Sequence, residues 1–488
     1  MIRFKRVLFI VLLLGCLGVQ SFFSKAAAAE ITIRGYYFTF SRMPTFSFET
    51  WKTIVDGIHH DRGNMVLLWI GGGFRSRKFP ITWEYNREHR NLQKDFVRDL
   101  IDYAHSKGIK VLMGLTPFSY DGVNQYPLRY PELKAIQANG RLVGLSGIHC
   151  WGYAMNPSRA RAQQFMLEYT RELIFDFYPN ADGLMIESSD YAICHCEDCK
   201  GSYYQKEFQF VKRISEEIWQ KNPRATILVY PHYFTGRSVP GFEVRAAAER
   251  FDPRWTLFFT PHSAHVDLDL LKQARSAIYW DSSPVLKTPP EIQKGALTAL
   301  KFGISGYVPS LEAFSFVAAQ PEGGESFVVG KRQKPFGFEW MPAEENPYEE
   351  LLIRVNRIAY REFTQAPGLD YQEFQSRLGR EIFGNSASHE ATEDLLSLQA
   401  SFFADRSWFS ASPMVSPDLL EDKLRAGSLS LGQLRDYRDR LEHLRKIAQK
   451  YARSSDPARR EIHRIAAWIS TSWAGEEHLL SDPLRSGE

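Results

Sequence analysis

Short apolar runs alternate with amphipathic stretches between Ile31 and Pro309, and this alternation constrains the fold more than any other feature of the chain. Each pair resembles a strand followed by a helix, the βα unit of a parallel sheet. Eight runs have the length and composition of strands: Ile31–Phe38, Asn64–Ile70, Lys110–Leu115, Gly183–Glu187, Ala225–Tyr230, Trp255–Thr260, Ser276–Trp280 and Ile304–Val308. Eight such units predict a (β/α)8 barrel, a fold of about 250 residues.

Helical stretches separate most of these runs. Two examples are residues 92–106 and 157–177, and Asn156-Pro157 at the start of the second is typical of an N-cap followed by proline at the first helical position. An open doubly wound sheet is the alternative, but no glycine-rich phosphate loop follows the first predicted strand. Gly71-Gly72-Gly73 follows the second strand and lacks the required spacing. We expect a tight turn or a close backbone approach there.

The chain is too long for one ordinary core, since it has 488 residues. We expect a barrel domain over residues 30–319, a linker or long loop over 320–344 and a helical domain over 345–488. In the last segment, apolar residues recur in steps of three and four, which places them on one face of a helix. They are Leu434, Tyr437, Leu441, Leu444, Ala448 and Tyr451.

The first 29 residues resemble a signal peptide, with basic residues, an apolar run and small residues before Glu30. Lipid attachment at Cys16 is the competing interpretation, and it is the one route by which we expect membrane contact. Both predict an exported protein, periplasmic or extracellular. The 60 basic and 57 acidic residues nearly cancel, so we expect no nucleic-acid partner.

The C-terminal ends of barrel strands share one mouth, where barrel enzymes carry their active sites. Aromatic rings, carboxylates and histidines are frequent at these positions, and this mixture favours a carbohydrate over a phosphate or nucleotide. We predict Glu187 and Asp281 as catalytic residues. The predicted substrate-binding residues are Tyr37, Trp69, Asp190, Tyr230, His232, His262, Trp280 and Glu312.

Cleavage of a glycosidic bond needs two carboxyl groups. Glu187 is the preferred general acid because a short apolar strand delivers it to the mouth. Asp281 follows the seventh predicted strand and is the preferred nucleophile or base, in the arrangement of the large retaining barrel clan, whose acid and nucleophile lie on strands 4 and 7. Asp190 and Glu312 are alternatives for the second carboxylate.

Three cysteines follow Glu187 closely, at positions 194, 196 and 199, and Cys150 lies in the preceding loop. Cys150, Cys194, Cys196 and Cys199 could bind a structural zinc ion, or in an exported protein they could form two disulfides. Either arrangement would fix the loop after Glu187. We expect no cofactor for catalysis.

Three segments resemble those of a group of extracellular bacterial TIM-barrel glycoside hydrolases with a Cys-x-Cys-x-x-Cys loop. They are Met155-Asn-Pro-Ser158, Asp182-Gly-Leu-Met-Ile-Glu187 and Cys194-His-Cys-Glu-Asp-Cys199. That group is distantly similar to α-glucuronidases and β-hexosaminidases, which also append a helical domain. The resemblance implies a glycosidase with Glu187 at its site. Hexosaminidases carry adjacent Asp-Glu at the end of strand 4, whereas Ile186 precedes Glu187 here.

Two rival functions fit the same residues. The first is a non-catalytic carbohydrate-binding barrel, which would need the aromatic residues but not the carboxylates. The second is a metal-dependent hydrolase that uses His232, His262 and His265 with Asp281, although these histidines lack a shared close spacing.

Overall fold

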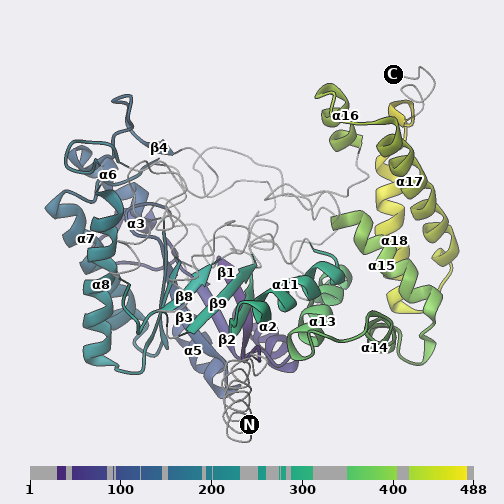
Figure 1. Ribbon diagram of the computed structural model, residues 1–488, viewed down its shortest axis with the longest axis horizontal. Helices are drawn as coiled ribbons and strands as arrows, with labels where there is room; N and C mark the ends of the chain where they lie inside the picture. Colours follow the sequence, from purple (N-terminus) through teal and green to yellow (C-terminus); the bar gives the residue numbers. More distant parts are fainter. Residues whose placement is uncertain are drawn as a thin grey trace, which may run out of the picture.

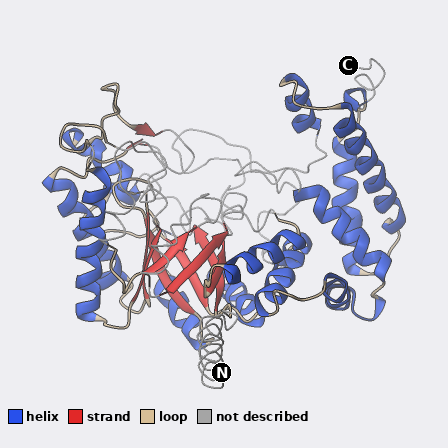
Figure 2. Cartoon of the chain, viewed as in Figure 1, coloured by secondary structure: helices blue, strands red, loops and turns tan. Residues whose placement is uncertain are grey.

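Eight parallel strands close into a barrel at the centre of the molecule, in the order β1-β10-β9-β8-β7-β6-β3-β2 (Figure 2). They are β1 (Ile33–Thr39), β2 (Met65–Trp69), β3 (Lys110–Leu115), β6 (Gly183–Glu187), β7 (Thr226–Tyr230), β8 (Thr256–Phe259), β9 (Ser276–Asp281) and β10 (Gly306–Pro309). This computed structural model describes residues 30–39, 47–84, 92, 95–120, 122–145, 152–188, 194–200, 202–230, 251–259, 274, 276–281, 287–310, 349–403 and 417–480. The predicted (β/α)8 barrel is confirmed, and each predicted run overlaps one strand.

Helices follow the strands and cover the outside of the barrel (Figure 1). In the first part of the chain they are α2 (Phe48–His60), α3 (Ile81–Glu84), α5 (Val97–Ser106), α6 (Tyr126–Arg129), α7 (Ala160–Arg171), α8 (Tyr203–Lys221) and α11 (Pro289–Lys301). Three short helices, η2 (Val123–Gln125), η3 (Pro131–Leu133) and the π-helix η4 (Glu172–Phe177), and the strand pair β4 (Gly144–Leu145) and β5 (Gly152–Tyr153) complete this part. The helix predicted over 92–106 is observed from Val97.

The helix predicted over 157–177 begins later than expected. Asn156 is not its N-cap, because α7 starts at Ala160. The side-chain oxygen of Asn156 accepts instead from the backbone N–H of Ser158, at 2.9 Å, and forms a local turn. Because such a turn competes with helical hydrogen bonding, it delays the start of the helix.

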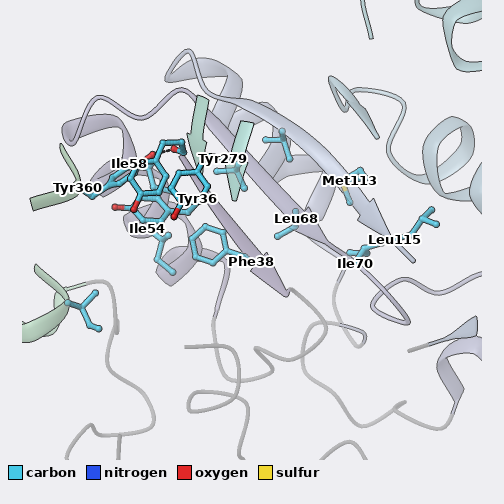
Figure 3. Packing of buried hydrophobic residues seen from close by; sticks show 14 of the residues in the cluster. Tyr36, Phe38, Ile54, Ile58, Leu68, Ile70, Met113, Leu115, Tyr279 and Tyr360 are labelled. Carbon is cyan, nitrogen blue, oxygen red and sulfur yellow. Dashed lines mark hydrogen bonds between the residues drawn. The ribbon is translucent and has the colours of Figure 1, made fainter. Parts of the chain in front are cut away.

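Side chains alternate between the lumen and the outer face along each strand, as the pleat requires. One buried cluster fills the lumen and contains Met185 of β6 and Trp280 of β9. The intervening residues, such as Leu184 and Ile186, belong to a second cluster between the strands and the helices. Figure 3 shows part of this outer layer, in which Tyr36, Tyr279 and Tyr360 lie close together. Glu187 is two residues beyond Met185, so the alternation turns it into the lumen.

Helix α13 (Leu351–Gln365) lies beside α11 and packs on the barrel, although it follows β10 by about 40 residues (Figure 1). The Tyr360 hydroxyl accepts from the Gly35 backbone N–H at 3.0 Å, and it donates to the carbonyl of Tyr307. Arg357 pairs with buried Asp61 at 2.8 Å. The first helix of the predicted C-terminal domain therefore also contacts both β1 and β10. The domain boundaries stay a prediction.

The remaining helices form the C-terminal part (Figure 1). They are α14 (Tyr371–Phe383), η7 (Gly384–Ser386), α15 (His389–Phe403), α16 (Pro417–Arg425), α17 (Leu431–Tyr451) and α18 (Pro457–Ser472). The predicted apolar face of α17 is confirmed, because all six of its residues are buried. It packs against α18, whose own buried face includes Ile462, Ile465 and Ile469.

Within the described part of the chain, no helix is both long and apolar enough to span a bilayer.

Candidate functional site

Five of the predicted site residues lie at or near the C-terminal ends of barrel strands. They are Tyr37 on β1, Trp69 on β2, Glu187 on β6, Tyr230 on β7 and Trp280 on β9. All five are buried, and the four aromatic ones belong to the lumen cluster. The sequence-predicted positions therefore form one group of side chains across the lumen.

Glu187 is the carboxylate at the centre of this group. Every residue of β6 is buried, and Glu187 itself is 7% exposed. The phenol of Tyr37 donates a hydrogen bond to Oε2 of Glu187 at 3.0 Å. Tyr37 comes from β1, which lies three strands away from β6 around the barrel, so this bond reaches across the lumen.

The aromatic rings of the lumen cluster pack on one another. Trp280 lies edge-on to Tyr37 and Tyr230, with ring centroids 5.7 and 5.0 Å away, and it stacks on Phe258 at 5.3 Å. On the other side of the lumen, Trp69 contacts Tyr120 at 5.9 Å. Rings that pack on each other in this way form the floor of the mouth, and their part in substrate binding stays a prediction.

Asp281 is the last residue of β9, where its backbone pairs with Pro309 of β10. Its side chain is not among those that the structure describes. The other predicted site residues, Asp190, His232, His262 and Glu312, lie outside the described residues, as do His265 and Cys150.

Another buried carboxyl group, Glu207, was not predicted from the sequence. It lies on α8 and is fully buried, and its Oε1 accepts from the hydroxyl of Ser188 at 2.6 Å. Burial raises the pKa of Glu207 to about 8, so the group is protonated at neutral pH. Ser188 follows Glu187 directly, so Glu207 holds the end of the strand that carries Glu187.

A pattern in the sequence could have revealed Glu207. The buried face of α8 contains Tyr203, Val211, Ile214 and Ile218 at steps of three, four and eight residues. Glu207 occupies a position on this face that an apolar residue would normally take. A lone acidic residue on an apolar helix face indicates a buried carboxyl group.

The first of the three glycines after β2 has a structural explanation. Gly71 has a φ of +47°, and a Cβ atom there would lie 2.3 Å from the ring of Trp69. Its carbonyl accepts from the hydroxyl of Tyr169 at 2.8 Å. The expected close backbone approach is confirmed, and it lies beside a residue of the barrel mouth.

The three cysteines that follow Glu187 in the sequence lie together in space. The Sγ atoms of Cys194, Cys196 and Cys199 lie within 4.8 Å of one another, and none of the three is in a disulfide. Contact with the Cys199 side chain lowers the pKa of Cys194 to about 5, and the same contact raises the pKa of Cys199.

A cavity of about 430 Å³ opens at the opposite end of the barrel. It is lined by Ile33, Asn64, Met65, Gly108, Lys110, Arg224, Ala225, Thr226, Arg254, Thr256, Ser276 and Ile278. These residues lie at the start of the strands and in the loops that lead into them. Because barrel enzymes carry their chemistry at the other end, this cavity is not our candidate site.

No protein-family model and no curated protein matches the chain. Among solved structures, a GH138 enzyme targeting pectin rhamnogalacturonan II matches with a TM-score of 0.55 and 11% identity, over 94% of this chain and 73% of that one. The O-GlcNAc hydrolase of Thermobaculum terrenum gives 0.49 and 12%, over 92% and 82% of the two chains. A GH20 exo-β-N-acetylglucosaminidase of Vibrio harveyi gives 0.47 and 14%, over 78% and 60%. The chain thus shares its fold with the GH138 glycoside hydrolase.

Proposed function

We propose that this chain is an exported glycoside hydrolase that cleaves a poly- or oligosaccharide, with Glu187 as general acid. The observation that carries the proposal is the position of Glu187: it ends the fourth barrel strand, faces the lumen, and receives the hydrogen bond of Tyr37 at 3.0 Å. A carboxyl group held at this end of a barrel can protonate a leaving oxygen.

The second carboxyl group in the proposal is Asp281, as nucleophile or base. It ends the seventh strand, so the two acidic residues come from strands that lie three apart around the barrel. Ile186 takes the place of the aspartate that precedes the glutamate in hexosaminidases. This difference favours a pair of enzyme carboxylates over chemistry assisted by an N-acetyl group of the substrate.

The test begins with a panel of glycans, in which rhamnogalacturonan is included because the GH138 enzyme targets it. On the substrate found, Glu187→Gln should lower kcat by roughly 100- to 10,000-fold, because the leaving oxygen would depart without a proton. A substrate with a weakly basic leaving group needs no such proton, so the variant should still cleave a dinitrophenyl glycoside.

Glu197→Gln is the matched control, since Glu197 is exposed on the loop after the same strand and should keep full activity. Tyr37→Phe keeps the ring and removes the hydrogen bond to Glu187. Loss of this donor from a buried carboxyl group is worth about 1–3 kcal/mol, or roughly 5- to 150-fold in kcat. Full activity of Glu187→Gln on the natural substrate would refute its role as the acid.

A further inference from the structure

We propose that Cys194, Cys196 and Cys199 bind one zinc ion through their thiolates, and that this ion fixes the loop between β6 and α8. The proposal goes beyond the glycosidase function and does not depend on it. It requires only the three described cysteines, and the fourth ligand of a tetrahedral ion can be a water molecule.

The spacing of the sulfur atoms fits a metal site. In a tetrahedral zinc site with Zn–S bonds of about 2.3 Å, the sulfurs lie roughly 3.8 Å apart. The three Sγ atoms here lie within 4.8 Å of one another, so a contraction of about 1 Å or less brings all three to one ion. Cys194 and Cys199 are each 1% exposed. A ligand set this enclosed and this rich in thiols favours a soft cation.

Neighbouring groups already point hydrogen-bond donors at the sulfurs. The side-chain N–H of Asn156 donates to Sγ of Cys196 at 3.3 Å, and the backbone N–H of Ile136 donates to Sγ of Cys194 at 3.5 Å. Donors of this kind orient metal-bound thiolates and offset their negative charge. The Asn156 side chain, whose turn displaced the predicted start of α7, therefore also contacts the cysteines.

The hydrogen bonds around the third sulfur allow a metal ion to bind. The thiol of Cys199 donates to Oδ1 of Asn156 at 3.0 Å. That oxygen also accepts from the backbone N–H and the hydroxyl of Ser158, at 2.9 and 2.6 Å. When zinc replaces the thiol proton, Asn156 therefore keeps two donors and no buried polar atom is left unsatisfied.

Three converging thiols fit a metal ion better than a disulfide. A disulfide joins two sulfurs at about 2.05 Å and would leave the third thiol unpaired. One metal ion can bind all three sulfurs at once.

The ion would connect separate parts of the chain. The first cysteine of the loop lies seven residues after Glu187, and the N–H of His195 donates to the carbonyl of Ile136 at 2.6 Å. Asn156 lies just before α7. Zinc at this point would therefore hold the loop after Glu187 against the segments that precede α7.

The test is elemental analysis of the full exported chain, purified without chelators, with His195→Ala as the matched control. His195 is exposed on the same loop and offers no sulfur. We expect about one zinc per chain in the wild type and in His195→Ala, and none in the Cys194→Ser/Cys199→Ser double variant. A zinc content that is unchanged in the double variant would overturn the proposal.

Cobalt binding provides a measurement that needs no variant. The wild-type chain, stripped of metal and kept reduced, should take up one Co²⁺ with a sulfur-to-cobalt charge-transfer band and intense tetrahedral d–d bands. Zinc should displace it. A wild-type chain that contains no zinc and takes up no cobalt with these bands would overturn the proposal, even if the double variant does not fold.

Discussion

Replacing Glu207 with glutamine should change how the stability of the protein depends on pH. Burial raises the pKa of this carboxyl group to about 8, from 4.5 in a solvated chain. Between these pH values the folded protein keeps a proton that the unfolded chain has released. The stability of the neutral buried form is therefore fully present below about pH 4.5 and is lost as the pH rises through 8.

The size of the effect follows from the two pKa values. Each unit of difference corresponds to about 1.4 kcal/mol, so ionisation of Glu207 in the unfolded chain lowers the free energy of unfolding by about 3 kcal/mol at pH 7 and about 5 kcal/mol at pH 9. Glutamine cannot ionise, and its amide oxygen can still accept from Ser188. Its NH₂ group lowers the free energy of unfolding by some amount, but that amount does not vary with pH.

The measurement is urea unfolding followed by tryptophan fluorescence, from pH 5 to pH 9, for the wild type, Glu207→Gln and Glu216→Gln. Glu216 is exposed on the same helix, so its variant should parallel the wild type. The advantage of Glu207→Gln over the wild type should grow by about 4 kcal/mol across this range. If the Glu207→Gln and wild-type curves run parallel, Glu207 is not a buried neutral acid and our reasoning is refuted.

Two further substitutions test contacts around the barrel. Tyr360→Phe should lower the free energy of unfolding by about 1–3 kcal/mol, because it leaves the buried N–H of Gly35 without its partner. The control is Tyr371→Phe, which removes a hydroxyl from neighbouring α14. Equal urea midpoints for the two variants would contradict the prediction. Gly71→Ala should cost about 1–3 kcal/mol and change the near-ultraviolet circular dichroism, since the new Cβ would lie 2.3 Å from the ring of Trp69. Gly108→Ala has a similar positive φ and nothing within 4 Å, so an equal loss in both variants would show that backbone strain, and not the clash with Trp69, is responsible.

The barrel could be predicted because its strands are buried on both faces. A run such as Met65–Trp69 is apolar throughout, and short apolar runs separated by amphipathic stretches are typical of a parallel barrel. The position of Glu187 followed from the same pattern, since a polar residue at the end of such a run must lie at the mouth. Pattern alone therefore gave both the fold and the position of the first candidate residue.

Other features depend on contacts between distant segments, which local patterns do not encode. The bond from Tyr37 to Glu187 joins residues 150 positions apart, and that from Ser188 to Glu207 joins a strand end to a helix. The N-cap predicted at Asn156 was wrong because its side chain forms a local turn and contacts cysteines some 40 residues away. Sequence patterns indicate which residue types are available, whereas tertiary structure determines their partners.

The position of Tyr360 has a consequence for the order of events during synthesis. The barrel closes where β1 meets β10, and the side chain that bonds to Gly35 and Tyr307 at this seam comes from a helix 325 residues after Gly35. Contacts at such separation form late, since the intervening chain must first be ordered. A chain emerging from the ribosome or from an export channel cannot complete this seam until α13 has followed. Until α13 has followed, this seam of the barrel is incomplete, and the edge of β1 must not pair with other strands.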